Sequence, residues 1–163
     1  MHFFSTLDLG NLISKAVIRS LMRKHRINPL LLYAYLNTDY YIDVPDAPFK
    51  LNIGRYSLEL DRLHQKLGVN TSLYITAWNP FSDQLTDEEN NAKQQMLVSD
   101  IIDLGFDMIT GRGIAQSGEW PPEESIVVLG CDESTAITLS QKYRQNAVVF
   151  SDENAIPRLI ETE

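Results

Sequence analysis

Side chains able to bind a small polar ligand recur at the ends of apolar segments in this chain. Amide groups offer hydrogen-bond donors and acceptors together, and indole rings offer flat apolar faces. Such a set suits a planar, hydrogen-bonding ligand such as a nucleobase, a nucleotide or a small amide. The candidate binding residues are Trp78, Asn79, Asn90, Arg112, Trp120, Ser125, Gln145 and Asn146.

Charged groups in the same segments indicate what chemistry would accompany binding. Glu124 is the clearest candidate for a general acid or base, because an apolar neighbour such as Trp120 raises the pKa of a carboxyl group. Arg112, between two glycines, and the amides of the helix start at Thr86 suit a phosphate or carboxylate. The chemistry expected is hydrolysis or group transfer, with Glu124 as the catalytic residue that activates water or a hydroxyl group.

Each candidate also has an ordinary structural role. Asn79 before Pro80 is a common turn device, and Gln145 can tie a loop to the backbone. Trp78 fits a core position, and Glu124 fits a surface ion pair. The sequence leaves the ligand site and the purely structural interpretation both open.

Other chemistries find less support in the sequence. No glycine-rich loop has the P-loop or Rossmann form, and no His/Cys cluster has zinc-ligand spacing. Cys131 ends a buried-looking strand, which argues against a reactive thiol. His64 lies within an expected helix, where a lone histidine is usually a surface or hydrogen-bonded side chain. We expect the acidic group at Glu119, Glu123 and Glu124 to be a solvated loop, with carboxylate metal binding as the open alternative; we assign no metal site and identify no cofactor.

The elements that position these residues are centred on the apolar run at 73–75. Trp78, Asn79 and Pro80 end this strand, and Pro80 favours an extended backbone at Asn79. Thr86 and Glu89 form a T-x-x-E capping box that begins a helix. The segments expected to follow are a helix at 86–104, strands at 106–110, 126–129 and 147–150, and a helix at 132–143.

The resulting order is strand, helix, strand, strand, helix, strand. It predicts an α/β protein of the α+β type with a ferredoxin-like split β-α-β core. In that core the ends of the first two strands lie beside the starts of the last two. Asn79, Arg112, Glu124 and Gln145 are therefore expected at one edge of the sheet.

The N-terminal part is expected to add a hairpin and two helices. Strands at 31–44 and 49–53 form the hairpin, and a helix at 58–67 ends at Gly68. A basic amphipathic helix is expected at 8–25, and the final residues at 153–163 read as a tail or short helix. The predicted division is residues 1–27 as the basic helix and residues 28–163 as one domain.

Composition and charge limit the classes of protein. The net charge of −8 argues against nucleic-acid binding by the whole surface, since a basic face is needed to neutralise phosphates. Five basic side chains fall in residues 1–27, where Asp8 is the one acidic residue, so this segment can pair with a partner or a second copy. The single cysteine and the lack of a long apolar segment predict a cytoplasmic protein without a transmembrane span.

Four motifs in order resemble a known family. They are YLNTDY at 35–40, ITAWNP at 75–80 with Asn90 after it, GEWPPEES at 118–125 and QNAVVF at 145–150. Together they resemble the bacterial family of unknown function DUF3293 over about residues 33–150. The resemblance implies no established activity. Two features depart from the family pattern, namely Arg144, where a glycine is usual, and the basic N-terminal helix.

Two functional hypotheses therefore stand. The first is a small-molecule site at the sheet edge, catalytic or not, for which Asn79→Ala would abolish binding and leave the fold intact. The alternative is a non-enzymatic regulatory or interaction module that docks a protein partner, or a second copy, through residues 8–26.

Overall fold

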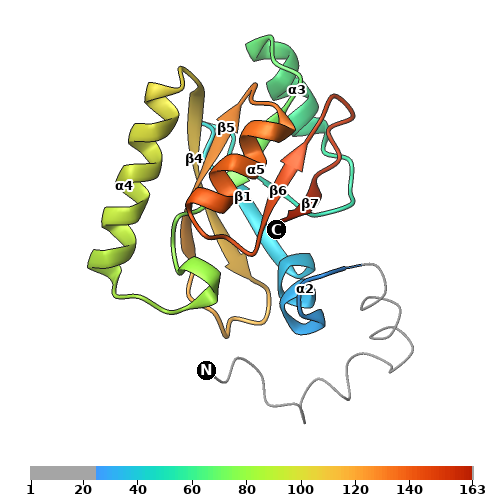
Figure 1. The fold of residues 1–163 in the computed structure, drawn as a ribbon. Coiled ribbons are helices and arrows are strands. Elements are labelled where there is room, and N and C mark those ends of the chain that lie inside the picture. Colours follow the sequence, from blue (N-terminus) through green and yellow to red (C-terminus); the bar gives the residue numbers. More distant parts are fainter. Residues whose placement is uncertain (1–24, 163) are drawn as a thin grey trace.

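A seven-stranded sheet organises the computed structural model, which describes residues 25–162 (Figure 1). The strand order is β2-β1-β4-β5-β3-β6-β7, and every neighbouring pair is antiparallel. The strands are β1 (Thr38–Ile42), β2 (Phe49–Leu51), β3 (Ser72–Ile75), β4 (Asp107–Ala115), β5 (Glu123–Leu129), β6 (Ala147–Ser151) and β7 (Arg158–Glu161). The expected mixed α/β class and the β1–β2 hairpin are confirmed. The helix predicted at 8–25 lies outside the described residues apart from its last position.

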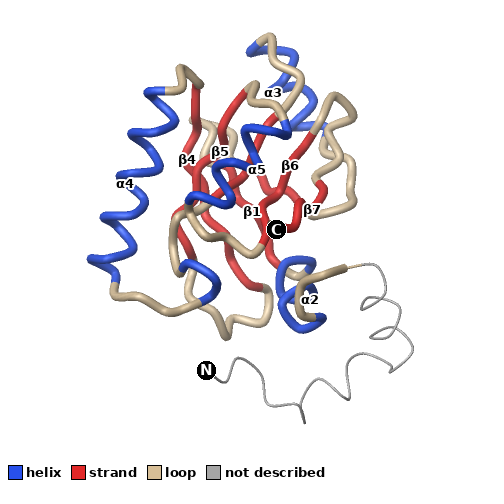
Figure 2. Tube along the Cα trace, in the orientation of Figure 1, coloured by secondary structure: helices blue, strands red, loops and turns tan. Residues whose placement is uncertain are grey.

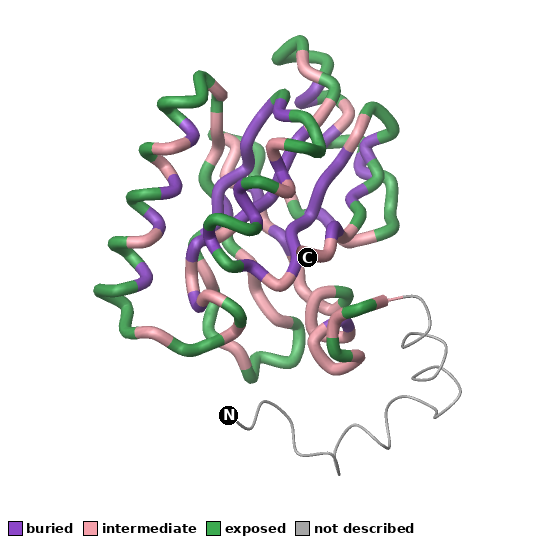
Figure 3. The backbone as a smooth tube through the Cα atoms, in the orientation of Figure 1, coloured by how far each residue is buried: buried purple, intermediate pink, exposed green. Residues whose placement is uncertain are grey.

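Helices cover both faces of the sheet (Figures 1 and 2). On one face, α4 (Asp87–Asp103) and α5 (Glu133–Lys142) bury Leu97, Ile101 and Leu139 against the strands. On the other face, α3 (Leu58–Leu67) buries Leu60 and Leu63. The strands at the centre are buried, while the outer side of α4 is exposed (Figure 3). This sandwich leaves the strand ends and their loops as the places where polar groups meet.

The predicted start of α4 is confirmed. Thr86 Oγ1 accepts a hydrogen bond from the Glu89 amide at 3.3 Å, and the Glu89 carboxylate accepts one from the Thr86 amide at 2.9 Å. Asp87, Glu88 and Glu89 lie in the first turn, where the helix dipole favours negative charge. The cap fixes the direction in which α4 carries Asn90 and Gln94 toward the end of β3.

Two predicted segments are wrong, and a third is too short. Residues 29–36 form helix α2 (Pro29–Leu36) rather than the first part of a strand, because Asn28 caps the helix and Pro29 occupies its first position. Residues 158–161 form β7, which pairs with the preceding strand β6, and this pairing supplies order that the sequence of residues 153–163 does not indicate. The predicted strand at 106–110 extends to Ala115, so the GRG triplet belongs to β4 and not to a loop.

None of the helices formed by residues 25–162 combines the length and hydropathy required to cross a membrane.

Candidate functional site

Two buried asparagines join the end of β3 to the start of α4. The Asn79 amide donates to Asn90 Oδ1 at 2.8 Å, and Asn90 Nδ2 donates to Asn79 Oδ1 at 3.0 Å. Asn79 Oδ1 also accepts from the Leu85 amide at 3.1 Å. Asn79 is only 8% exposed, so these hydrogen bonds form away from water. The pair fixes the position of the remaining Asn79 group, Nδ2.

Glu123, the first residue of β5, accepts a hydrogen bond from Asn79 Nδ2. Asn79 Nδ2 donates to Glu123 Oε1 at 2.7 Å, and Trp120 Nε1 donates to the same oxygen at 2.8 Å. Within the described residues Oε2 takes part in no hydrogen bond, and it is not sealed from solvent. Burial raises the pKa of Glu123 above its ordinary value, and the two donors oppose this rise only in part. Glu123 is therefore a carboxyl group with one fixed oxygen and one available oxygen.

Tyrosines surround this carboxyl group on the α3 face of the sheet. Tyr40 lies across from Gly113, which in turn lies across from Glu123. The Tyr40 and Tyr74 rings meet edge to face with centroids 5.2 Å apart. Burial, followed by the charge of Glu123, raises the pKa of Tyr35. These phenols stay neutral. Among the described residues, no positively charged side chain forms an ion pair with Glu123.

A second strand end is bound to the same loop. Gln145 Nε2 donates to the carbonyl oxygen of Trp78 at 3.1 Å, and Asn146 Nδ2 donates to Ser82 Oγ at 2.9 Å. The Phe81 amide donates to the carbonyl oxygen of Arg144 at 2.6 Å. The loop after β3 is thus held from α4, β5 and β6 at once.

Comparison with known proteins supports the predicted family. Residues 75–148 match DUF3293. That family is described as a protein of unknown function. No curated protein and no solved structure matches the chain. The DUF3293 segment runs from the last residue of β3 into β6, and it contains every residue of the Asn79, Asn90, Glu123 and Gln145 contacts described above.

Backbone strain is concentrated in this part of the DUF3293 segment. Asn79, Phe81 and Ser82 have φ values of 46°, 51° and 64°, and Arg144 has φ of 52°. The extended backbone predicted at Asn79 is therefore wrong: Asn79 adopts the left-handed region, which asparagine tolerates and which its tertiary hydrogen bonds hold in place. Arg144 also lies in the left-handed region, where a glycine would cost least.

Among these residues, the left-handed backbone costs the most conformational energy at Phe81. An aromatic side chain in the left-handed region is strained by roughly 1–2 kcal/mol, and its ring is 52% exposed, so burial returns little of that energy. Strain of this kind gathers at functional sites. The ring presents an apolar surface beside the polar cluster.

Replacing Phe81 by glycine therefore has an unusual expected result. Phe81→Gly is expected to change the free energy of unfolding by no more than about 1 kcal/mol, because relief of strain offsets the lost ring contacts. Phe81→Ala loses the same ring but keeps a strained backbone, and it should be less stable than the glycine variant by about 1 kcal/mol. Urea unfolding of both variants measures this order, and an alanine variant of equal or greater stability would contradict it.

Two buried donors in the DUF3293 segment have no hydrogen-bond partner among residues 25–162. Gln94 Oε1 accepts from the Ala77 amide at 2.9 Å, but Gln94 Nε2 makes no hydrogen bond. Trp78 Nε1 is likewise buried without a partner. Unpaired buried donors are rare and costly, and a bound water or ligand is the usual explanation.

The structure separates Arg112 and Glu124 from the cluster. The two residues lie opposite each other on β4 and β5, and both are exposed. Arg112 approaches Asp43 at 3.7 Å. Alternation along β5 places Glu124 on the α4 face with Ile126 and directs Glu123 and Ser125 to the opposite face. Trp120 thus contacts Glu123, not Glu124.

The sequence favoured Glu124 as the acid or base, whereas Glu123 is the carboxyl group that contacts Asn79 and Trp120. The signal was available in the strand itself, because Val127 and Leu129 share a face with every second residue before them. Ser125 Oγ donates to the carbonyl oxygen of Glu123 at 3.2 Å. Across residues 25–162, no three His, Cys, Asp or Glu side chains are arranged to hold a metal ion.

Proposed function

We propose that the cluster at the end of β3 is a binding site for a small polar ligand, with Glu123 as its acid or base. The observation that carries this proposal is the Glu123 carboxyl group, which burial holds at a raised pKa while two donors occupy only one of its oxygens. Glu123 has no ion-pair partner in the part of the chain that the structure describes. A half-buried carboxyl group with a raised pKa and no ion-pair partner costs stability and is typical of functional sites.

The chemistry of the cluster indicates the class of ligand. Asn79 and Trp120 direct any proton of Glu123 to Oε2, where it can be donated to a ligand or taken from one. The exposed Phe81 ring offers a stacking surface. A nucleobase, nucleotide or small amide fits these groups, and hydrolysis or group transfer fits a carboxyl acid or base.

We infer a ferredoxin-like core for the same segment. The order β4-β5-β3-β6 and its antiparallel pairings support this inference, with β1, β2 and β7 as additions. A cytoplasmic, bacterial setting is part of the proposal, supported by the single, buried Cys131 and the family resemblance.

The other predicted roles stay predictions. Glu124 as a catalytic residue and Arg112 as an anion-binding residue depend on the exposed α4 face of β4 and β5. Protein docking or self-association through residues 8–26 falls almost wholly outside the described residues, and so does the domain boundary at 27/28. The contacts next to that boundary are those of Glu161, which accepts from the Arg26 amide at 2.7 Å and contacts His25 Nδ1 at 2.5 Å.

A thermal-shift screen with matched glutamine variants tests the proposed site. The native protein, Glu123→Gln and Glu124→Gln are screened against nucleosides, nucleotides, phosphorylated metabolites and small amides. A ligand at 100 times its dissociation constant stabilises the native state by about 2.7 kcal/mol, a shift of roughly 5–10 °C for a domain of this size. We expect such a shift in the native protein and in Glu124→Gln, and at least about ten-fold weaker binding in Glu123→Gln.

Two outcomes would contradict the proposal. If Glu124→Gln alone loses the ligand, the site lies on the α4 face and the sequence-based assignment of Glu124 holds. If no compound shifts the native protein, the cluster is structural.

A further inference from the structure

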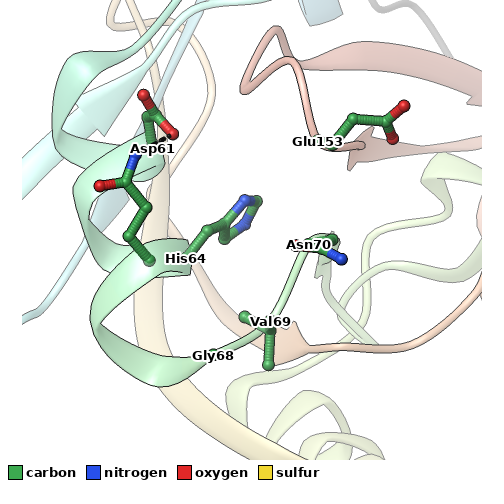
Figure 4. Close-up of a pocket in the computed structure, with 7 residues that line it drawn as sticks. Asp61, His64, Gly68, Val69, Asn70 and Glu153 are labelled. Carbon is green, nitrogen blue, oxygen red and sulfur yellow. Dashed lines mark hydrogen bonds between the residues drawn. The ribbon is translucent and has the colours of Figure 1, made fainter.

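A polar pocket lies at the opposite end of the sheet from the Glu123 cluster. It is formed by α3, by the turn from α3 to β3 and by the turn between β6 and β7, and its volume is about 340 Å³ (Figure 4). That volume is within the range of small-ligand sites. The side chains that matter for its chemistry are Asp61, His64, Gln65, Asn70 and Glu153.

His64 is the buried polar side chain of this pocket. Its side chain projects from α3 toward the space between Asn70 and Glu153 (Figure 4), yet the residue is only 4% exposed. His64 Nε2 lies 3.1 Å from Ser72 Oγ. Among the described contacts His64 Nδ1 has no hydrogen-bond partner. Burial lowers the pKa of His64, so the ring is neutral and can accept a hydrogen bond.

The charge of the pocket is negative. Asp61 is held in place, because Tyr56 donates its hydroxyl to Oδ2 at 2.8 Å and Gln65 Nε2 donates to Oδ1 at 3.0 Å. These two hydrogen bonds fix the carboxylate, so Asp61 contributes a negative charge at a set position. Glu153 is exposed on the facing turn, and no Lys or Arg lines the pocket. A cation carrying hydrogen-bond donors matches this lining.

We propose that this pocket binds a small organic ammonium ion, the protonated head of a primary amine or diamine. Glu153 is the counter-ion, His64 Nδ1 accepts one N–H when the ring proton is on Nε2, and the Asn70 carbonyl accepts another. A metal ion is a poorer match, since the described residues contain no group of three His, Cys, Asp or Glu side chains able to hold one. The amine is favoured because it needs acceptors and charge rather than a closed coordination shell.

An NMR titration with 1,4-diaminobutane tests the proposal on the full-length protein. The signals followed are the His64 ring and the Val69 methyl groups, at fixed pH and ionic strength. We expect saturable shifts at both residues, and binding at least about ten-fold weaker in Glu153→Gln, which loses a charged acceptor on an exposed turn. Glu88→Gln, an exposed carboxylate on α4, should bind as the native protein does, and uncharged 1,4-butanediol should give no saturable shift.

Three results would overturn the proposal. The first is the absence of a saturable response to the diamine. The second is equal binding by the native protein and Glu153→Gln, which would show general attraction to an acidic surface. The third is an equal response to 1,4-butanediol or to a divalent cation alone, which would assign the pocket to a different class of ligand.

Discussion

Gly111→Ala is expected to lower the free energy of unfolding by at least about 3 kcal/mol. A Cβ atom at position 111 would lie 2.4 Å from the carbonyl oxygen of Tyr41 and 3.1 Å from the Tyr74 ring. The first contact is with backbone and cannot be relieved by a rotamer change. Tyr74 crosses β4 here and donates its hydroxyl to the Tyr41 carbonyl at 3.1 Å, so both partners would have to move.

Gly113 provides the matched control. It lies two residues along the same strand, and a Cβ there would meet only Thr38 Cγ2 at 3.7 Å, an ordinary contact. Gly113→Ala should change stability by less than about 1 kcal/mol. Thermal unfolding measures the difference, which should be roughly 6–12 °C between the two variants. Equal stabilities would show that β4 and β1 are not paired as described and that the GRG triplet is not a packing feature.

Asn79→Ala is expected to cost about 3–5 kcal/mol. The substitution removes the acceptor of the Leu85 amide and the donor to Glu123, and it places alanine at φ of 46°. The expectation that Asn79→Ala leaves the fold intact is therefore replaced by this one. An alanine variant alone cannot separate binding from folding.

Two further variants separate the contributions of backbone strain and lost hydrogen bonds to the cost of Asn79→Ala. Asn79→Gly loses the same hydrogen bonds without the strain, and it should be about 1 kcal/mol more stable than Asn79→Ala. Asn79→Ala and Asn90→Ala share partners, so their effects on unfolding in urea should be non-additive by about 0.5–3 kcal/mol. Additive effects would mean that the two asparagines do not interact.

Local signals account for the parts of the fold that sequence predicted. The capping box at Thr86 and the left-handed Gly68 act within a few residues, so α4 and α3 were placed correctly. Strand β7 was missed because its order comes from pairing with β6. Helix α2 was missed although Asn28 and Pro29 mark its start. Leucine and tyrosine at 30–36 suit a strand or a helix, and only tertiary context decides between them.

The site shows the same division. The amide residues 79, 90 and 145 follow from element ends, and the structure places them together at one loop, although their role in binding is still a prediction. The choice between Glu123 and Glu124 depends on where β5 begins, and a shift of one residue reverses the face of every side chain. Sequence does not locate the start of a strand to within one residue. The strained backbone at Phe81 has no sequence signal at all.

We propose that ionised Glu123 lowers the stability of the fold because the residue serves a site rather than the fold. Unfolding of the native protein and of Glu123→Gln between about pH 4 and pH 8 tests this most directly. A raised pKa in the folded state gives stability that is fully present below the unfolded value near 4.5 and is lost as pH rises through the folded value. Glutamine keeps the acceptor for Asn79 and Trp120 and does not titrate. We predict that Glu123→Gln becomes progressively more stable than the native protein as pH rises. The contradicting result is a glutamine variant whose stability falls further below that of the native protein as pH rises from 4 to 8. That result would show that the ionised Glu123 stabilises the fold.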